Sequence, residues 1–285
     1  MFEMILSPRK AKRAPWEMFF VGLVYASLAI LLVNWFFSKD VVLSKYSGIL
    51  VVTFTVMFCT PFMYFLIRNE EEEDTKYVGM TSLLKEHGKA VFALMWLFMG
   101  FIVAFSFWYL ILGADANFKA QIETYCSINK PNNFDACIQE HGIKSGGSGT
   151  GFVTSTDRFF MIFVNNIYVL IFTIVFSLIF GAGAIFILAW NASVIAAAIG
   201  IFSRSDLGNL PLGISRYMIH GIPEILAYFI AFLAGGIISM AITKHDTHKE
   251  RFWNILQDSL NLVIIAIVIL LLAALIEVYV TPILF

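Results

Sequence analysis

The longest stretch of this chain without a charged side chain runs from 159 to 203 and is 45 residues long. At about 1.5 Å of rise per residue, one uninterrupted helix of that length extends roughly 67 Å. That is about twice the ~30 Å thickness of the hydrocarbon core of a bilayer. A chain that crosses a membrane must therefore turn back inside this stretch. Gly181-Ala182-Gly183 lies near the midpoint and predicts the position of the turn.

The composition of the whole chain favours a membrane protein. Hydrophobic residues make up 59% and charged residues 14% of the 285 residues, against about 45–50% and about 25% in typical globular domains. So few charges cannot cover the surface of a soluble enzyme, and so many apolar residues exclude a disordered chain. The 19 basic and 20 acidic residues nearly balance, which excludes a nucleic-acid-binding protein.

The neutral tracts predict transmembrane helices, because about 20 helical residues are enough to cross the bilayer once. The predicted fold class is an all-α, polytopic integral membrane bundle of about seven helices. The predicted spans are 16–37, 48–67, 90–112, 158–180, 184–203, 215–243 and 259–281. A re-entrant hairpin over 158–203 is the alternative to two full spans there, and it enters and leaves on the same face.

Lys and Arg residues are unevenly divided between the two sets of connections. Eleven lie in the amino-terminal segment and in the connections 68–89 and 244–258, and eight lie on the other side. Since the side richer in Lys and Arg faces the cytoplasm, the amino terminus is predicted to be inside a multi-pass cell-membrane protein and the loop 113–157 outside. The first apolar tract is longer than a signal-peptide core and has no small-residue cleavage site, so it is predicted to remain as an anchor.

Two of the three cysteines, Cys126 and Cys137, lie in the loop 113–157. An oxidising exterior permits a disulfide between them, and the alternative is two free thiols that never meet. Two cysteines at this spacing lack the further ligands of a zinc site, so neither a metal nor a cofactor is predicted. Cys59, in the second span, is expected to be a small core residue. The glycine-rich segment 144–151 predicts a flexible linker.

Polar side chains within the spans carry the functional information, because they are costly in hydrocarbon. His220 and Glu224 are four residues apart and therefore share one face of the sixth span. Pro223 removes a backbone donor beside them and can kink the helix. The candidate intramembrane polar site consists of Asn165, Asn166, Asn191, His220, Pro223 and Glu224.

Two interpretations of this polar site remain open from the residues. The site is either a substrate or ion site or a proton relay, or it is a set of hydrogen bonds between helices, each worth only about 0.6 kcal/mol. Glu277, near the end of the last span, is expected to reach water by snorkelling.

Short motifs in the last four spans occur in a fixed order. They are Phe163-Val164-Asn165-Asn166, the pair Gly181 and Gly183, Trp190-Asn191 with Gly200, and His220-Gly221-Ile222-Pro223-Glu224 followed by Gly235-Gly236. Their order and spacing resemble the stage II sporulation protein M family, although Ala192 stands where that pattern has glycine. The resemblance covers about 90–281, so the chain looks like a longer, archaeal-type relative. It predicts a two-span extension with an acidic cytoplasmic connection over 1–89, and a family-like membrane domain over 90–285.

The resemblance implies a non-enzymatic membrane scaffold, since the family member of spore-forming bacteria holds peptidoglycan-degrading partners outside the cell. The sporulation role itself does not transfer to an archaeal-type relative. HExxH and GxSxG motifs are absent from the sequence. The first hypothesis is a scaffold or assembly factor whose partners are the lipid bilayer and other membrane or extracellular proteins, with self-association left open. The alternatives are a transporter or channel component that uses the polar site, and an intramembrane hydrolase.

Overall fold

The computed structural model describes residues 8–40, 42–74, 80–113, 117–129, 134–140, 155–180, 185–203, 210–243 and 250–284. The predicted turn at 181–183 and the predicted linker at 144–151 lie outside these residues. Each regular element within them is helical. In chain order they are α2 (Pro8–Arg13), α3 (Glu17–Phe37), η1 (Leu43–Tyr46), α4 (Ser47–Asp74), α5 (Met80–Leu112), α7 (Lys119–Asn129), α8 (Phe134–Glu140), α9 (Ser155–Phe180), α10 (Ile185–Ser203), α11 (Leu210–Thr243), α12 (Glu250–Leu275), η5 (Ile276–Val280) and α13 (Thr281–Leu284).

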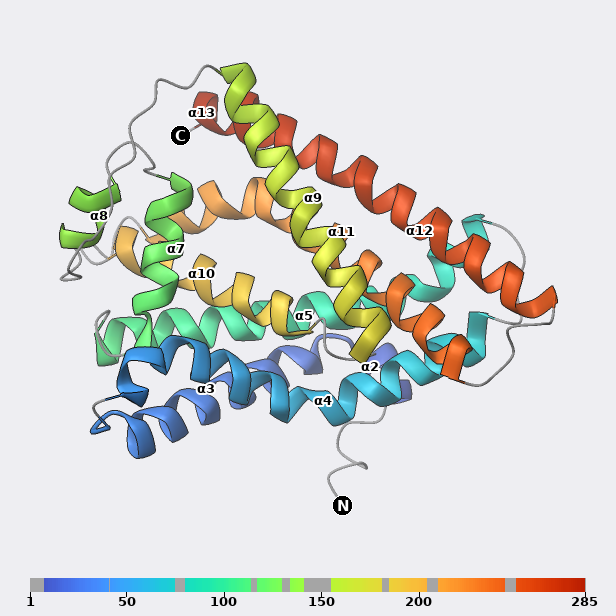
Figure 1. The fold of residues 1–285 in the computed structure, drawn as a ribbon, viewed down its shortest axis with the longest axis horizontal. Helices are drawn as coiled ribbons and strands as arrows, with labels where there is room; N and C mark the ends of the chain where they lie inside the picture. The colour runs from blue at the N-terminus through green and yellow to red at the C-terminus, as the bar shows by residue number, and fades with distance from the viewer. Residues whose placement is uncertain are drawn as a thin grey trace.

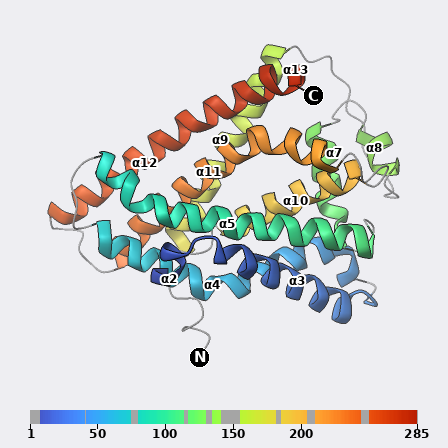
Figure 2. The ribbon, with the colours of Figure 1, turned by 180° about the vertical axis from the view of Figure 1, so that it is seen from behind.

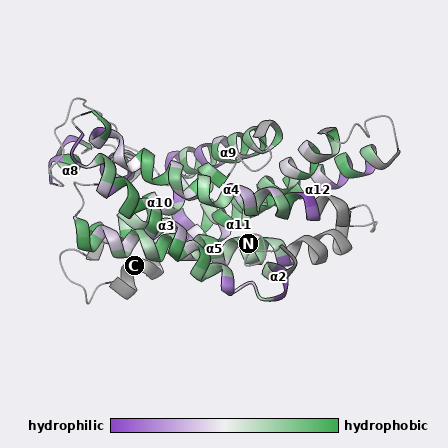
Figure 3. Cartoon of the chain, turned by 90° about the horizontal axis from the view of Figure 1, so that it is seen from below, coloured by the Kyte–Doolittle hydropathy of each residue, from purple (hydrophilic) through white to green (hydrophobic). Residues whose placement is uncertain are grey.

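Six helices in the described part of the chain are long and apolar enough to cross a membrane: α3, α4, α5, α9, α11 and α12. The prediction of an all-α, polytopic membrane bundle is confirmed. The remaining predicted span corresponds to α10, whose 19 residues rise about 28 Å. This length is slightly less than the ~30 Å of the hydrocarbon core, so α10 is the shortest of the seven. Figure 3 shows hydrophobic residues along most of the bundle and hydrophilic ones at α2 and α8.

Several helices continue beyond the predicted spans. The helix predicted to end at 67 continues to Asp74, the one predicted to begin at 90 begins at Met80, and the one predicted to begin at 259 begins at Glu250. Hydropathy marks where the lipid ends, whereas the helix itself continues into charged residues. Glu and Lys are good helix formers, so the loss of hydropathy at these positions does not end the helix.

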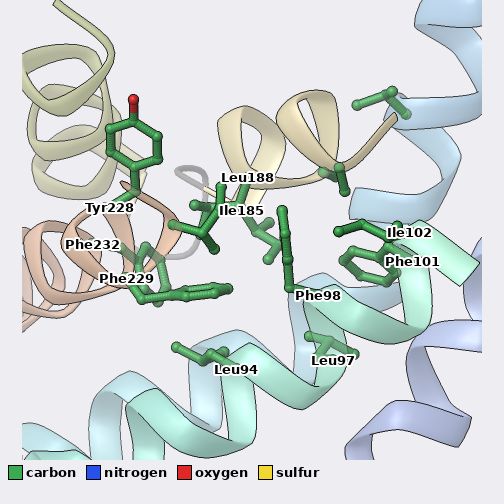
Figure 4. Packing of buried hydrophobic residues seen from close by; sticks show 14 of the residues in the cluster. Leu94, Leu97, Phe98, Phe101, Ile102, Ile185, Leu188, Tyr228, Phe229 and Phe232 are labelled. Atoms are coloured by element: carbon green, nitrogen blue, oxygen red, sulfur yellow. The ribbon is translucent and has the colours of Figure 1, made fainter. Parts of the chain in front are cut away.

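The bundle is built around α5 and α11. Helix α5 packs against α3 and α10, and α11 packs against α9, α10 and α12, as Figures 1 and 2 show from opposite sides. In the most apolar 18-residue stretch of α11, 72% of the residues are buried, which is the highest share among the six candidate spans. Figure 4 shows how aromatic and aliphatic side chains from α5, α10 and α11 meet in the core, among them Phe98, Ile185 and Phe229.

Helices α3 and α5 approach each other at two glycines. A Cβ atom on Gly22 would overlap the backbone carbonyl of Leu97, and one on Gly100 would overlap the backbone carbonyl of Phe19. Small residues at such crossings let two membrane helices come close enough for their backbones to be in van der Waals contact. Further along the same pair, the indole N–H of Trp108 donates to the hydroxyl of Ser27 at 3.0 Å.

Helices α7 and α8 form a cap at one end of the bundle, and a disulfide between Cys126 and Cys137 joins them. The predicted disulfide is confirmed. Gln121 of α7 is fully buried, and its Nε2 donates to the carbonyl oxygen of Gly48 at 3.0 Å and to Oγ of Ser193 at 3.2 Å. These bonds connect α7 to the start of α4 and to α10. The cap is therefore held to the transmembrane helices rather than suspended on a loop.

The connection between α3 and α4 lies at the same end as the cap (Figure 1). One carboxylate oxygen of Asp40 accepts hydrogen bonds from the backbone N–H groups of Val42 and Leu43, both at 2.8 Å. These two bonds favour the ionised carboxylate and hold the pKa of Asp40 below its usual value.

We expect Gly100→Val to destabilise the bundle by about 1–3 kcal/mol, because the added side chain forces α3 and α5 apart. The free energy of unfolding in detergent micelles, measured by circular dichroism during titration with SDS, tests this. Gly88→Ala is the matched control, since a Cβ atom on Gly88 meets nothing within 4 Å. Equal stability of the two variants would contradict the close contact between α3 and α5.

We expect the double replacement of Cys126 and Cys137 by Ser to lower stability by roughly 3 kcal/mol, the chain-entropy value for a loop of this size. Thermal unfolding in detergent measures the effect. Reductant should lower the melting temperature of the wild-type protein and leave that of the double variant unchanged. An equal response of both proteins would show that reductant acts elsewhere than on this disulfide.

Candidate functional site

Three polar side chains lie along one face of α11 at intervals of four residues: His220, Glu224 and Tyr228. Residues four apart on a helix are neighbours on its surface, so the three form a stripe. His220 and Glu224 are half-buried, and Tyr228 is fully buried. Pro223 lies inside the helix beside them. Because it has no N–H, the backbone carbonyl one turn earlier has no partner in the helix ladder.

Asn166 of α9 joins two members of this stripe. Its side-chain Nδ2 donates to Oε1 of Glu224 at 2.6 Å, and its Oδ1 accepts from the hydroxyl of Tyr228 at 3.0 Å. A carboxamide suits this position because it offers both a donor and an acceptor. Asn166 is itself 6% exposed, so the Glu224–Asn166–Tyr228 bridge lies within the contact between α9 and α11.

The other side of the stripe faces the end of the chain, where Glu277 in η5 and Thr281 at the start of α13 are also four residues apart. Helix α12 runs back along α11 (Figure 1), so a step of four forward on α11 corresponds to a step of four backward on the returning chain. His220 accordingly meets Thr281, with Nδ1 and Oγ1 3.4 Å apart. Glu224 is near enough to Glu277 for the two carboxylates to repel each other.

Thr281 makes two polar contacts, one to its own helix and one to His220. The single hydroxyl hydrogen of Thr281 is donated to the backbone carbonyl of Ile276 at 3.1 Å. With that hydrogen used, Oγ1 can accept from Nδ1 of His220 in the tautomer that carries its hydrogen there.

The helix widens to a π-helical turn over Ile276–Val280, directly at Glu277. Pro282 follows and cannot donate the N–H that an α-helix needs at this point, and its ring collides with the carbonyl one turn before it. The N–H of Thr281 instead bonds to the carbonyl of Ile276, five residues back. Such single π turns are frequent at functional sites, and here the turn presents Glu277 to α11.

Among the described side chains, one cation has an electrostatic effect on this group of acids. Arg158, in the first turn of α9, acts electrostatically on Glu277 and stabilises its charge. The charges of Glu277 and Glu224 in turn act on each other and on Tyr228. The described part of the site thus has two carboxylates, one guanidinium and one imidazole. The carboxylate of Glu277 and the guanidinium of Arg158 are the ones nearer the ends of their helices. We define these residues as the polar network: Arg158, Asn166, His220, Glu224, Tyr228, Glu277 and Thr281.

The cap reaches the polar network through two aromatic residues. The hydroxyls of Tyr125 in α7 and Tyr217 in α11 are 3.2 Å apart and hydrogen-bonded. The ring of Tyr217 contacts His220 edge-on, with centroids 6.5 Å apart. The residue next to Tyr125 is Cys126, so the disulfide fixes the part of α7 that makes this contact.

The structure brings together four of the six residues named from the sequence: Asn166, His220, Pro223 and Glu224. Asn191 does not join them, because its Nδ2 donates to the carbonyl of Ile187 in its own helix at 2.8 Å. Asn165 is exposed on the surface of α9. Consecutive residues of a helix point about 100° apart, so Asn165 and Asn166 cannot both face α11.

Sequence reasoning missed Tyr228 and Thr281, and it assigned Glu277 to the membrane surface. A signal for Tyr228 was available, since it continues the four-residue spacing of His220 and Glu224. The pairing of Thr281 and Glu277 with α11 depends on the register between two helices, which spacing within one helix does not reveal. Glu277 is half-buried and faces other charges of the network.

The chemistry of the site is that of proton and cation handling or of structural hydrogen bonds. Among the described residues, no group of three His, Cys, Asp or Glu side chains is placed to hold a metal ion. A cavity of about 400 Å³ lies elsewhere, between α5, α11 and α12. Its lining is apolar and includes Phe92, Leu233 and Leu262, so it offers no polar route to Glu224.

Comparison with known proteins places the chain in a family. The sequence model of the family described as stage II sporulation protein M matches residues 15–282. The chain belongs to the stage II sporulation protein M family. The matched range reaches beyond the motif-bearing part, 90–281, and takes in α3 and α4. In Methanocaldococcus jannaschii, the "Uncharacterized protein MJ0793" is 33% identical over 126 residues, which are 42% of this chain and 69% of that protein. No solved structure matches.

We expect Asn166→Leu to destabilise the protein by about 1–3 kcal/mol, because it leaves both Glu224 and the hydroxyl of Tyr228 without their partner. Tyr228→Phe removes one bond and should cost about 0.6 kcal/mol. Unfolding with SDS in mixed micelles measures both. Ser259→Ala is the control, since the buried hydroxyl of Ser259 has no partner among the described residues. If Asn166→Leu were no worse than Ser259→Ala, the bridge would contribute nothing to stability.

Proposed function

We propose that this protein is a non-enzymatic membrane scaffold that organises partner proteins through the cap at the outer face. The observation that supports this most is that side chains of the polar network hydrogen-bond to one another between helices. Asn166 satisfies Glu224 and Tyr228 across the contact of two helices, and His220 is bonded to Thr281. Polar side chains used in this way fix one arrangement of helices. A scaffold needs such a fixed arrangement to present a constant surface.

The cap is suited to be the surface that partners contact. It is joined by a disulfide, bonded to α4 and α10 through Gln121, and connected to α11 through Tyr125. On its outer side, Ala136, Gln139 and Glu140 of α8 are exposed. The distribution of Lys and Arg residues supports placing the cap outside the cell.

Transport of protons or cations is the second candidate, and the electrostatic repulsion between the carboxylates of Glu224 and Glu277 favours it. Two carboxylates in hydrocarbon are costly, and a shared proton or small cation offsets their repulsion. On this alternative, Asn166 and Tyr228 orient Glu224, and Arg158 controls access to Glu277.

We expect Glu224→Gln to leave scaffold function intact, because its amide oxygen can still accept the bond from Asn166. A photo-reactive amino acid at Ala136 or Gln139 should give the same discrete protein adducts in native membranes from the wild type and from Glu224→Gln. The same amino acid at Val24, which is 49% exposed on α3, serves as the control and should give none.

Flux measurements separate the two candidates. Purified protein is placed in liposomes that contain an entrapped pH indicator, and a pH gradient or a sodium gradient is applied. On the scaffold proposal, protons should cross these membranes no faster than those of empty liposomes. Flux that the wild type supports and Glu224→Gln abolishes, together with the absence of adducts at the cap, would assign the protein to transport instead.

A further inference from the structure

One face of α9 is apolar, exposed and interrupted by a single polar residue. In the most apolar 18-residue stretch of α9, 17% of the residues are buried, against 28–72% in the corresponding stretches of the other five candidate spans. The opposite face packs on α11, where the hydroxyl of Ser177 bonds to the carbonyl of Phe232 at 2.8 Å and Gly235 allows close approach. The exposed face lies on the side of α9 that is turned away from α11.

Eight residues of α9 between 160 and 175 are exposed: Phe160, Met161, Val164, Asn165, Tyr168, Ile171, Phe172 and Val175. One row among them has alternating steps of four and three residues and consists of Met161, Asn165, Tyr168, Phe172 and Val175. Alternating steps of four and three residues are the pattern of a coiled-coil seam, in which Asn165 and Phe172 take one core position and Met161, Tyr168 and Val175 the other. We call these five residues the α9 seam.

Asn165 is anomalous if lipid covers the α9 seam. It lies about 15 Å along the helix from Ser155, in the middle of the candidate span. Lipid chains offer no hydrogen-bond partner at that depth. Its carboxamide makes no hydrogen bond with the described residues, in contrast to Asn166 and Asn191, which both do. A polar residue in this position is expected to bond across a helix–helix interface.

We infer that the α9 seam is the interface between two copies of this chain. Both copies insert in the membrane with the same topology, so a two-fold axis along the membrane normal brings the two α9 helices together in parallel. In a parallel pair, residues at the same core position face each other, and Asn165 meets its own counterpart. A carboxamide carries both a donor and an acceptor, so the two side chains satisfy each other.

The geometry also explains why a copy of the same chain fits better than an unrelated helix. A two-fold interface is self-complementary, and each residue on one side needs only its own equivalent on the other. Asn is the residue that pairs with itself at such positions and fixes register and oligomeric state. The inference is independent of whether the polar network serves a scaffold or a transporter, because Asn165 points away from that network.

Cross-linking in native membranes tests the geometry. With Asn165 retained, Phe172→Cys should form a disulfide-linked dimer on mild oxidation, because the two α9 helices bring this position to the axis. Val24→Cys is the matched control on α3, with 49% exposure at Val24 against 56% at Phe172. The inference is overturned if Val24→Cys cross-links as well as Phe172→Cys, or if neither does.

Dilution in liposomes tests the role of Asn165. Energy transfer between labelled copies, measured over a range of protein-to-lipid ratios, should show self-association of the wild type that Asn165→Leu weakens about tenfold. Asn165→Gln should retain most of it, and Asn191→Leu, which removes a bond within one helix, should not change it. Wild-type protein that stays monomeric at every ratio, or equal association of Asn165→Leu and wild type, would falsify the interface.

Discussion

The absence of hydrogen-bonding partners in lipid is the constraint on which this structure depends. Backbone groups meet the constraint by forming helices, and each long apolar tract of the sequence accordingly becomes one. Polar side chains have no such local solution unless they bond to a carbonyl of their own helix, as Asn191 does. The others must find each other between helices, and this requirement explains why Asn166, Glu224 and Tyr228 meet where α9 contacts α11.

The same constraint accounts for how much the sequence could predict. Neutral tracts identify the fold class and the approximate helices, because hydropathy reports directly on the solvent that surrounds each segment. The disulfide between Cys126 and Cys137 could also be predicted, since both cysteines lie in one loop. The helix ends at Asp74, Met80 and Glu250 could not, because charged residues end a hydrophobic tract without ending a helix.

The candidate site was only partly accessible from the sequence. His220 and Glu224 share a face by spacing alone, but the partners of that face belong to other helices. Whether Glu224 meets Glu277, and His220 meets Thr281, depends on the register of α11 against the returning chain. Asn165 and Asn166 illustrate the same difficulty, since the sequence presents them as a pair and the helix directs them to different surfaces.

The depth of each contact determines which parts of the bundle can move against each other. A hydrogen bond within hydrocarbon has no competitor, so separating Asn166 from Glu224 leaves both groups without a partner. The bond between Tyr125 and Tyr217 lies at the end of the bundle under the cap, where water can replace either hydroxyl at little cost. Motion of the cap relative to α11 is therefore less costly than motion of α9 relative to α11.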